Sequence, residues 1–298
     1  MIVIKGLRPR KRLRLIKKIL DGFLLLIIII VLTIIMKVFL FATFKIPTAS
    51  MIPATEPGDH IYVNKLSLGP RLYENWGFLK GKKTKLKRIR GFSKVKRNDV
   101  LVFDYPYQTP DKIKQGGNVF YLKRCVAIPG DTFYIENGIY KIKGISDNLG
   151  HIERQKELSG RDEDSFADNV LYTFPNDTAH FHWTIKNFGH LYVPAKGDNI
   201  RIDSLSVILY KNLIEYETEK KISTKNGSVY LGDSTIKIYT FLQDYYFMAG
   251  DLIFDSVDSR YWGLLPHDLI VGKASFIWKS EDMNTGKYKW KRFLKKVK

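Results

Sequence analysis

Two side chains in this 298-residue sequence are of types that could together carry out nucleophilic catalysis. Ser50 lies between two prolines in the segment IPTASMIPATEPGD, directly after a long apolar run. Lys123 lies in VFYLKRCVAI, where its apolar neighbours predict an environment with little water. Burial lowers the pKa of a lysine because it disfavours the charged form, and a neutral amine can accept the proton of a serine hydroxyl. The pair therefore indicates the Ser-Lys variant of serine-protease chemistry.

A third segment, YYFMAGDLIFDSVDSRYWG, places further polar residues between two apolar runs. Asp258 and Arg260 are two residues apart, so in an extended stretch they share one face and could form a salt bridge that stiffens the site. Ser256 would lie on the same face. These three residues are candidates for supporting Ser50 and Lys123.

Simpler interpretations of the same residues remain open at this point. Ser50 could be an ordinary turn residue before a proline. Lys123 could be an edge-strand lysine that discourages aggregation, and Asp258 and Arg260 could form a surface ion pair. Cys125 is expected in the core, although a lysine two residues away could activate a cysteine nucleophile.

Metal and cofactor chemistry have little support in the sequence. The single cysteine excludes an intrachain disulfide and a cysteine-based zinc site. His180 and His182 alternate onto one strand face with His190 nearby, but acidic or sulfur ligands do not clearly converge on them. We therefore predict no metal and no cofactor.

Residues 19–44 are almost wholly apolar and predict a transmembrane helix, since about 20 apolar residues cross a bilayer core. Residues 1–18 form a basic segment before it, so the positive-inside rule places the N-terminus in the cytoplasm and everything after Lys45 outside. A cleaved signal peptide is the alternative, although its apolar core is typically 7–15 residues. The basic residues of the segment are Lys5, Arg8, Arg10, Lys11, Arg12, Arg14, Lys17 and Lys18.

The formal net charge of +19 does not indicate nucleic acid as a partner, because much of it is concentrated beside the apolar run and in one loop. Both clusters suit anionic lipid head groups, and a solvated loop is the alternative for the second. The second cluster comprises Lys80, Lys82, Lys83, Lys85, Lys87, Arg88 and Arg90.

The three chemically active segments resemble, in order and separation, the conserved motifs of bacterial type I signal peptidases. SMIPAT at 50–55 is similar to the family motif Ser-Met-x-Pro-Thr-Leu, and KR at 123–124 followed by PGD at 129–131 resembles the motif of the base. Residues 250–263 are similar to Gly-Asp-Asn-x-x-x-Ser-x-Asp-Ser-Arg-x-x-Gly. The matching segments, with the anchor, cover about half of the chain.

The resemblance implies that Ser50 is the nucleophile and Lys123 the general base. It further implies that the Thr48 hydroxyl joins the Ser50 backbone N–H in the oxyanion hole, and that Ser256 hydrogen-bonds and orients the lysine. Asp258 and Arg260 would hold the local framework. Two positions depart from the family: Leu252 stands where Asn is usual, and Ala54-Thr55 replaces Thr-Leu. Neither departure removes a catalytic atom.

The remaining sequence predicts a mainly β protein, because aromatic and β-branched residues alternate between Gly-Asp, Asn-Gly and Pro-Gly turns. We expect an N-terminal transmembrane helix and an antiparallel β-sheet catalytic domain with an inserted, second β-rich domain. Residues 45–143 and 241–298 would form the catalytic domain and residues 144–240 the insert. Within the insert, 145–170 reads as loop or short helix, 204–217 as a short helix, and 180–202 as strand. The basic tail after Lys287 is expected on the surface.

These features predict a membrane-bound serine endopeptidase that removes N-terminal signal peptides from exported preproteins after small residues. It would cross the bacterial inner (plasma) membrane once, with its catalytic domain on the outer, periplasmic or extracellular, face. Its partners would be preprotein signal peptides, membrane lipid and possible secretion machinery. One alternative is a catalytically silent, membrane-tethered β module that binds exported proteins; another, a self-cleaving Ser/Lys regulator, predicts a DNA-binding N-terminal domain where this chain has an apolar segment.

Overall fold

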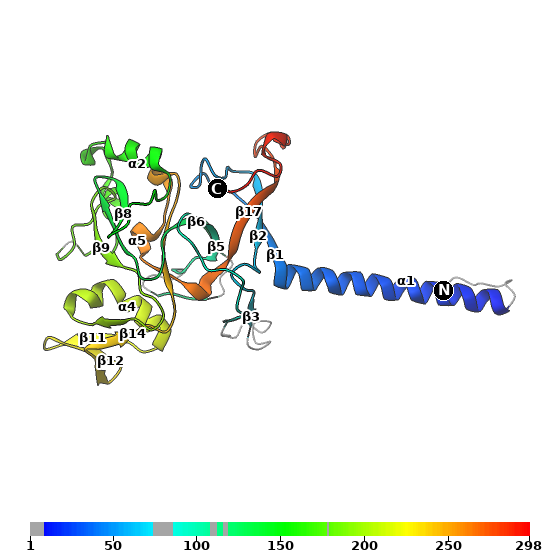
Figure 1. Ribbon diagram of the computed structural model, residues 1–298, viewed down its shortest axis with the longest axis horizontal. Coiled ribbons are helices and arrows are strands. Elements are labelled where there is room, and N and C mark those ends of the chain that lie inside the picture. Colours follow the sequence, from blue (N-terminus) through cyan, green and yellow to red (C-terminus); the bar gives the residue numbers. More distant parts are fainter. Residues whose placement is uncertain (1–8, 74–85, 108–111, 116–118, 178) are drawn as a thin grey trace.

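The computed structural model describes residues 9–73, 86–107, 112–115, 119–177 and 179–298. A long N-terminal helix projects from a β-rich body that holds the rest of the chain (Figure 1). The fold class predicted from the sequence is confirmed: the body is built from antiparallel sheets with a few short helices.

The projecting helix consists of α1 (Pro9–Ile35) and a π-helical turn, Met36–Leu40. Within residues 13–40, an 18-residue window has a mean hydropathy of 3.2, and none of that window is buried. At about 1.5 Å per residue, such a helix is long enough to cross a bilayer core of about 30 Å.

The predicted span of 19–44 is wrong at its C-terminal end. Strand β1 begins at Phe41 and runs to Lys45, where its residues pair with β2 (Asp59–Asn64) in antiparallel register from Phe41↔Asn64 to Lys45↔His60. The mostly apolar residues 41–44 therefore belong to a strand of the sheet and not to the membrane helix.

Besides β1 and β2, the main sheet contains β5 (Val100–Asp104), β6 (Phe120–Ala127), β15 (Tyr245–Ala249), β16 (Leu265–Pro266) and β17 (Ile270–Ser280). Its seven strands have the order β1-β2-β17-β5-β6-β15-β16. Strand β6 therefore lies between β5 and β15 and pairs with both.

Smaller elements surround the main sheet. A hairpin of β3 (Arg71–Tyr73) and β4 (Leu86–Arg88) lies near the anchor side of the body (Figure 1). The helices expected in the insert are present as α2 (Ile152–Ser159), α3 (Asp168–Leu171) and α4 (Ser204–Thr218). The other strands are β7 (Thr132–Glu136), β8 (Ile139–Ile142), β9 (Phe188–Tyr192), β10 (Asn199–Arg201), β11 (Ile222–Lys225), β12 (Ser228–Leu231), β13 (Ser234–Thr235) and β14 (Ile238–Thr240).

The predicted strand over 180–202 is only partly right. Strand begins at Phe188, while 180–187 is irregular apart from one isolated bridge at Thr184. The Asp177 carboxylate accepts hydrogen bonds from the backbone N–H groups of Ala179 and His180, which fixes a turn where alternation suggested a strand.

The insert and the main sheet share one core, and the topology differs from the boundary predicted at residue 143. Strands β7 and β8 pair with each other and β7 also pairs with β9, so this three-stranded sheet spans that boundary. Phe133 of β7 stacks on Phe247 of β15 with ring centroids 4.1 Å apart, and Phe188 of β9 packs edge-on against Phe247. All three side chains are buried.

The basic segments also differ from the expectation. Lys5 and Arg8, and Lys80, Lys82, Lys83 and Lys85, lie outside the described residues. Arg88 does not face outward, because its guanidinium donates to the backbone carbonyls of Gly69, His267 and Ile270. The tail after Lys287 is only partly on the surface, since Arg292 is buried and forms an ion pair with Asp59.

We predict that Phe133→Ala destabilises the protein by about 3–5 kcal/mol, because it removes a fully buried ring from the core that joins insert and sheet. Chemical denaturation followed by tryptophan fluorescence measures the loss. Phe92→Ala is the matched control, since Phe92 is 88% exposed. A loss of under about 1 kcal/mol for Phe133→Ala would contradict a shared core.

Candidate active site

Ser50 is presented by a tight turn that follows the first strand. The backbone N–H of Ile52 donates to the Ala49 carbonyl, and that of Thr55 donates to the Met51 carbonyl. Met51 is 1% exposed and anchors the turn in the apolar core beneath it. The Ser50 carbonyl accepts a hydrogen bond of ordinary length, 3.0 Å, from the Leu252 N–H. Ser50 is therefore a turn residue, as the simpler interpretation held, but one fixed from two sides.

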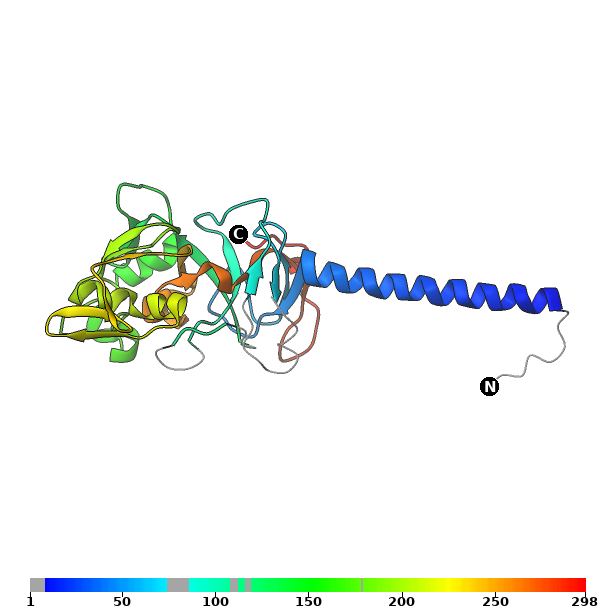
Figure 2. The same cartoon turned by 90° about the horizontal axis from the view of Figure 1, so that it is seen from below.

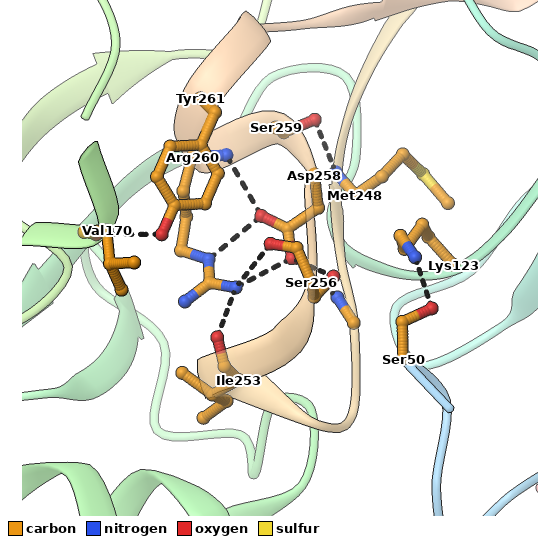
Figure 3. A network of polar contacts seen from close by, with 11 residues as sticks. Ser50, Lys123, Val170, Met248, Ile253, Ser256, Asp258, Ser259, Arg260 and Tyr261 are labelled. Carbon is orange, nitrogen blue, oxygen red and sulfur yellow. Dashed lines mark hydrogen bonds and ion pairs between the residues drawn. The ribbon is translucent and has the colours of Figure 1, made fainter. Parts of the chain in front are cut away.

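Lys123 lies on the interior strand β6, opposite Leu101 of β5, and is 4% exposed. This burial excludes the interpretation as an exposed edge-strand lysine, although β15 pairs with β6 only at Arg124, Cys125 and Ala127. Its Nζ lies 2.6 Å from Ser50 Oγ (Figure 3). In the neutral state of the amine, this geometry lets the serine hydroxyl donate to the lysine nitrogen.

The surroundings of Lys123 favour its neutral form. Burial lowers its pKa from the ordinary range to about 8. The negative charge of Asp258 raises the pKa and the positive charge of Arg260 lowers it, so the two charges act in opposite directions on the amine. At pH 8 about half of such an amine is neutral, against less than about 1% for a free lysine of pKa near 10.4.

Asp258 and Arg260 form a fully buried ion pair, which excludes the surface interpretation. Both side chains are 0% exposed, and Arg260 Nη2 and Nε lie 2.8 Å from the two carboxylate oxygens. Burial opposes the charged form of Asp258, but the guanidinium and several hydrogen bonds hold its pKa below the ordinary value. Arg260 Nη2 also donates to the Ile253 carbonyl at 3.0 Å (Figure 3).

The sequence led us to expect Asp258 and Arg260 in an extended stretch, and this expectation is wrong. Asp258 is not in a strand but caps the short helix α5 (Ser259–Trp262), and its carboxylate accepts the Arg260 N–H at 3.2 Å. The two side chains meet because Arg260, in the first turn of this helix, folds back on its own cap.

Ser256 belongs to this network, but its hydroxyl contacts Asp258 and not the lysine. Ser256 Oγ donates to Asp258 Oδ2 at 2.7 Å, and the described residues include no hydrogen bond between Ser256 and Lys123. The Gly250 N–H donates to the same carboxylate oxygen at 2.8 Å. A Cβ at Gly250 would lie 2.1 Å from Ser256 Oγ and 2.8 Å from the Ser50 carbonyl, so only glycine fits between them.

Sequence reasoning missed a second buried ion pair beside the site. Arg124, on the opposite face of β6 from Lys123, donates to both carboxylate oxygens of Asp251 at 2.7 and 2.6 Å. Asp251 is 1% exposed and lies next to Leu252, whose N–H holds the Ser50 carbonyl. The adjacent Lys-Arg and the Gly-Asp pair at 250–251 were the available signals, but they are far apart in sequence.

Thr48 lies beside the nucleophile and is exposed. Within the described ranges, neither the Thr48 hydroxyl nor the Ser50 backbone N–H donates to a protein acceptor.

The other candidate residues have structural surroundings. His180 contacts Asp177 at 3.1 Å and His190 stacks on Tyr134, and among the described residues no group of three metal-ligating side chains gathers. Cys125 is fully buried, which raises its pKa well above the ordinary value, as expected of a core residue.

The two departures from the family pattern preserve the contacts around Ser50. Leu252 holds the nucleophile segment through its backbone N–H, which any residue but proline supplies. Ala54 is 8% exposed and lies in the core beneath the turn.

The chain is similar to several known proteins. The family model "Signal peptidase, peptidase S26" matches residues 19–279. The chain is 28% identical to signal peptidase I of Buchnera aphidicola subsp. Baizongia pistaciae, over 88% of this chain and 77% of that protein. It is 28% identical to signal peptidase I of Pseudomonas fluorescens (85% and 69% covered) and 26% to that of Aquifex aeolicus (86% and 82%).

A buried serine-lysine contact on an antiparallel β scaffold behind an apolar helix defines a membrane-associated serine hydrolase. With the family match over most of its length, the chain belongs to the signal peptidases of peptidase family S26. It is thus a serine endopeptidase that removes signal peptides.

We predict that peptide-bond cleavage rises with pH through an apparent pKa of about 8, because the neutral form of Lys123 exists above its pKa. Arg260→Met should move this limb to higher pH, since it removes the positive charge that lowers the Lys123 pKa and leaves Asp258 to raise it. It should also destabilise the protein by about 3–5 kcal/mol, because a buried carboxylate loses its partner.

The measurement is the pH profile of kcat/KM for both proteins, taken below their unfolding temperatures. Arg201→Met is the control, since Arg201 is an exposed residue of β10. A limb that stays in place, or that moves to lower pH, would contradict an influence of the ion pair on the lysine.

Proposed function

We propose that Ser50 and Lys123 are the nucleophile and general base with which this signal peptidase cleaves preproteins. The observation that carries the proposal is the 2.6 Å contact between a buried amine and the serine hydroxyl. A lysine with a pKa of about 8 is neutral often enough near physiological pH to act as a base.

In the first half of the reaction, the neutral Lys123 amine takes the Ser50 proton as the hydroxyl oxygen attacks the scissile carbonyl. The tetrahedral intermediate collapses as the C–N bond breaks, and the lysine ammonium returns the proton to the leaving amine. An ester between Ser50 and the signal peptide remains. In the second half, the neutral amine takes a proton from water, whose oxygen attacks the ester, and the proton passes back to Ser50 as the serine is released.

The oxyanion of each tetrahedral intermediate would bind to the Ser50 N–H and the Thr48 hydroxyl. Removal of one such donor typically costs about 100-fold to 1,000-fold in rate. Asp258 and Arg260 would hold the framework, and Ser256 would act through Asp258, with which it shares a hydrogen bond of 2.7 Å.

The predicted preference for small residues before the cut also belongs to this proposal. It rests on the family resemblance of the motifs around Ser50 and Lys123. The substrate would be the signal peptide of an exported preprotein, and secretion machinery that delivers such chains would operate near this domain.

The apolar helix is proposed to cross the bacterial plasma membrane once, with residues 1–18 in the cytoplasm and the body on the outer face. Nine residues lie between the helix end at Leu40 and Ser50, so the ten steps along the chain reach at most about 36 Å. The nucleophile is therefore within reach of a chain that emerges from the bilayer.

A surface of the body supports contact with lipid. Figures 1 and 2 both place the C-terminal loop on the side of the body from which α1 projects. Aromatic and cationic side chains around a cavity of about 270 Å³ gather there, a combination that suits the membrane interface. They include Trp278, Lys279, Tyr288, Lys289 and Trp290.

The function is tested by processing of a purified preprotein by the full-length enzyme in detergent. Ser50→Ala and Lys123→Ala should each reduce cleavage by more than about 1,000-fold, because each removes half of the dyad. Lys141→Ala is the control, since Lys141 is a partly exposed lysine of β8 that forms a surface ion pair with Glu136. Cleavage that survives either dyad substitution in intact protein would overturn the assignment, and would favour the silent binding module.

The orientation is tested with single introduced cysteines in intact cells. Asn226→Cys, in the exposed turn between β11 and β12, should react with a membrane-impermeant maleimide, whereas Lys17→Cys should react only after permeabilisation. The native Cys125 is fully buried and should give little background. The reverse labelling pattern would contradict the proposed orientation.

A further inference from the structure

The last residues of the chain run back along the main sheet. We call residues 292–298 the C-terminal segment. The Leu294 N–H donates to the Ile277 carbonyl at 2.7 Å, and the Val297 N–H donates to the Ser275 carbonyl at 3.1 Å. An isolated bridge joins Phe276 and Lys296. The segment thus adds strand-like pairing to the part of β17 beyond its contact with β5.

At its start, this segment is tied to the loop that follows the nucleophile. Arg292 is 8% exposed; its Nε and Nη2 lie 2.9 and 2.6 Å from the Asp59 carboxylate oxygens, and its Nη1 lies 2.8 Å from Glu56. Asp59 also accepts the Glu56 N–H, which closes the turn at the end of the Ser50 segment. A buried, bidentate contact between a guanidinium and a carboxylate fixes the relative orientation of the two groups as well as their distance.

Close to its end, the segment packs on the small core that contains neighbours of the dyad. Val297 packs against a cluster that contains Met51, next to Ser50, and Leu122, next to Lys123. This core is separate from the larger one shared with the insert. Each half of the dyad therefore has a neighbour in the same small cluster.

The end of the segment reaches the strand that carries the base. Arg124 Nη2 donates to the Lys298 carbonyl at 2.9 Å while it pairs with Asp251. Asp251 precedes Leu252, whose N–H holds the Ser50 carbonyl. One short segment thus touches both sides of the Ser50–Lys123 contact.

We propose that the C-terminal segment positions the dyad, and that Arg292 is the positioning residue that ties the nucleophile loop to the strand of the base. The proposal rests on the proposed function of Ser50 and Lys123. No residue of the segment contacts Ser50 Oγ or Lys123 Nζ. The segment holds the loop that follows Ser50 and the strand that carries Lys123 at a fixed separation, and it keeps water out of the small core between them. A shift of about 1 Å between reacting groups can reduce a rate about 100-fold.

The test compares Arg292→Met with Lys291→Met, a neighbouring and exposed lysine, in the full-length protein. Arg292→Met should lower kcat about 10-fold to 100-fold with KM within about two-fold, because the dyad is misplaced while the substrate-binding residues remain. Arg292→Lys should restore part of kcat, since it keeps the charge opposite Asp59. Lys291→Met should match the unaltered protein.

A second pair of variants avoids the unpaired carboxylate that Arg292→Met leaves behind. Val297→Ser should also lower kcat, because it opens the small core, whereas Lys295→Ser changes an exposed side chain and should not. Thermal unfolding identifies a temperature at which every variant is folded, and all rates are compared there.

An independent readout is the pKa of Lys123 itself, measured by competitive acetylation and mass spectrometry without any substrate. Water that enters the loosened core should raise this pKa in Arg292→Met and Val297→Ser but not in the controls. Unchanged kcat and unchanged Lys123 pKa in both variants, with only a lower unfolding temperature, would overturn the proposal. If the unaltered protein cleaves no preprotein, the proposed function fails, and the Lys123 pKa alone then decides whether the segment positions the two side chains.

Discussion

A lysine amine must be taken out of water before it can act as a base near neutral pH, and this constraint explains the arrangement around Lys123. The side chain is placed on an interior strand, opposite Leu101 of β5, where it is 4% exposed. Removal of a charge from water is unfavourable, so the amine responds with a lowered pKa. Ser50 then enters from a turn anchored by Met51, so that the hydroxyl meets an amine that is already dehydrated.

The buried ion pair next to the dyad shows how such an amine can be kept neutral in a polar surrounding. Asp258 alone would favour the charged lysine, and Arg260 alone would disfavour it. The Asp258 carboxylate accepts hydrogen bonds from the Gly250 N–H and the Ser256 hydroxyl, while Arg260 opposes its effect on the Lys123 pKa. A buried pair of this kind rarely adds much stability over apolar residues, so its value here lies in fixing the loop that holds the Ser50 carbonyl.

The sequence predicts the parts of this protein that depend on local patterns. The apolar helix, the strand-rich class, the helix over 204–218 and the contact of Ser50 with Lys123 all agree with expectation. Its errors fall where a distant partner decides the outcome. Residues 41–44 read as helix because their pairing with β2 is invisible to hydropathy. Asp258 was expected in an extended stretch, because only the contacts of its carboxylate reveal that it caps a helix. The basic tail was expected on the surface, because its sequence does not reveal that Arg292 pairs with Asp59, 233 residues away.

Residues of the insert form hydrogen bonds with the short helix beside the dyad. The Tyr261 hydroxyl donates to the Val170 carbonyl at 2.8 Å, and the Phe174 N–H donates to the Arg260 carbonyl at 2.7 Å. Both bonds hold the short helix whose first turn carries the guanidinium facing Asp258. Phe188 of the insert also packs on Phe247 in the strand before Gly250, so inserted residues contact the chain on both sides of the loop from 250 to 262. The insert therefore contacts the site through the loop that carries Asp258 and Arg260, because its own residues hold that loop on both sides.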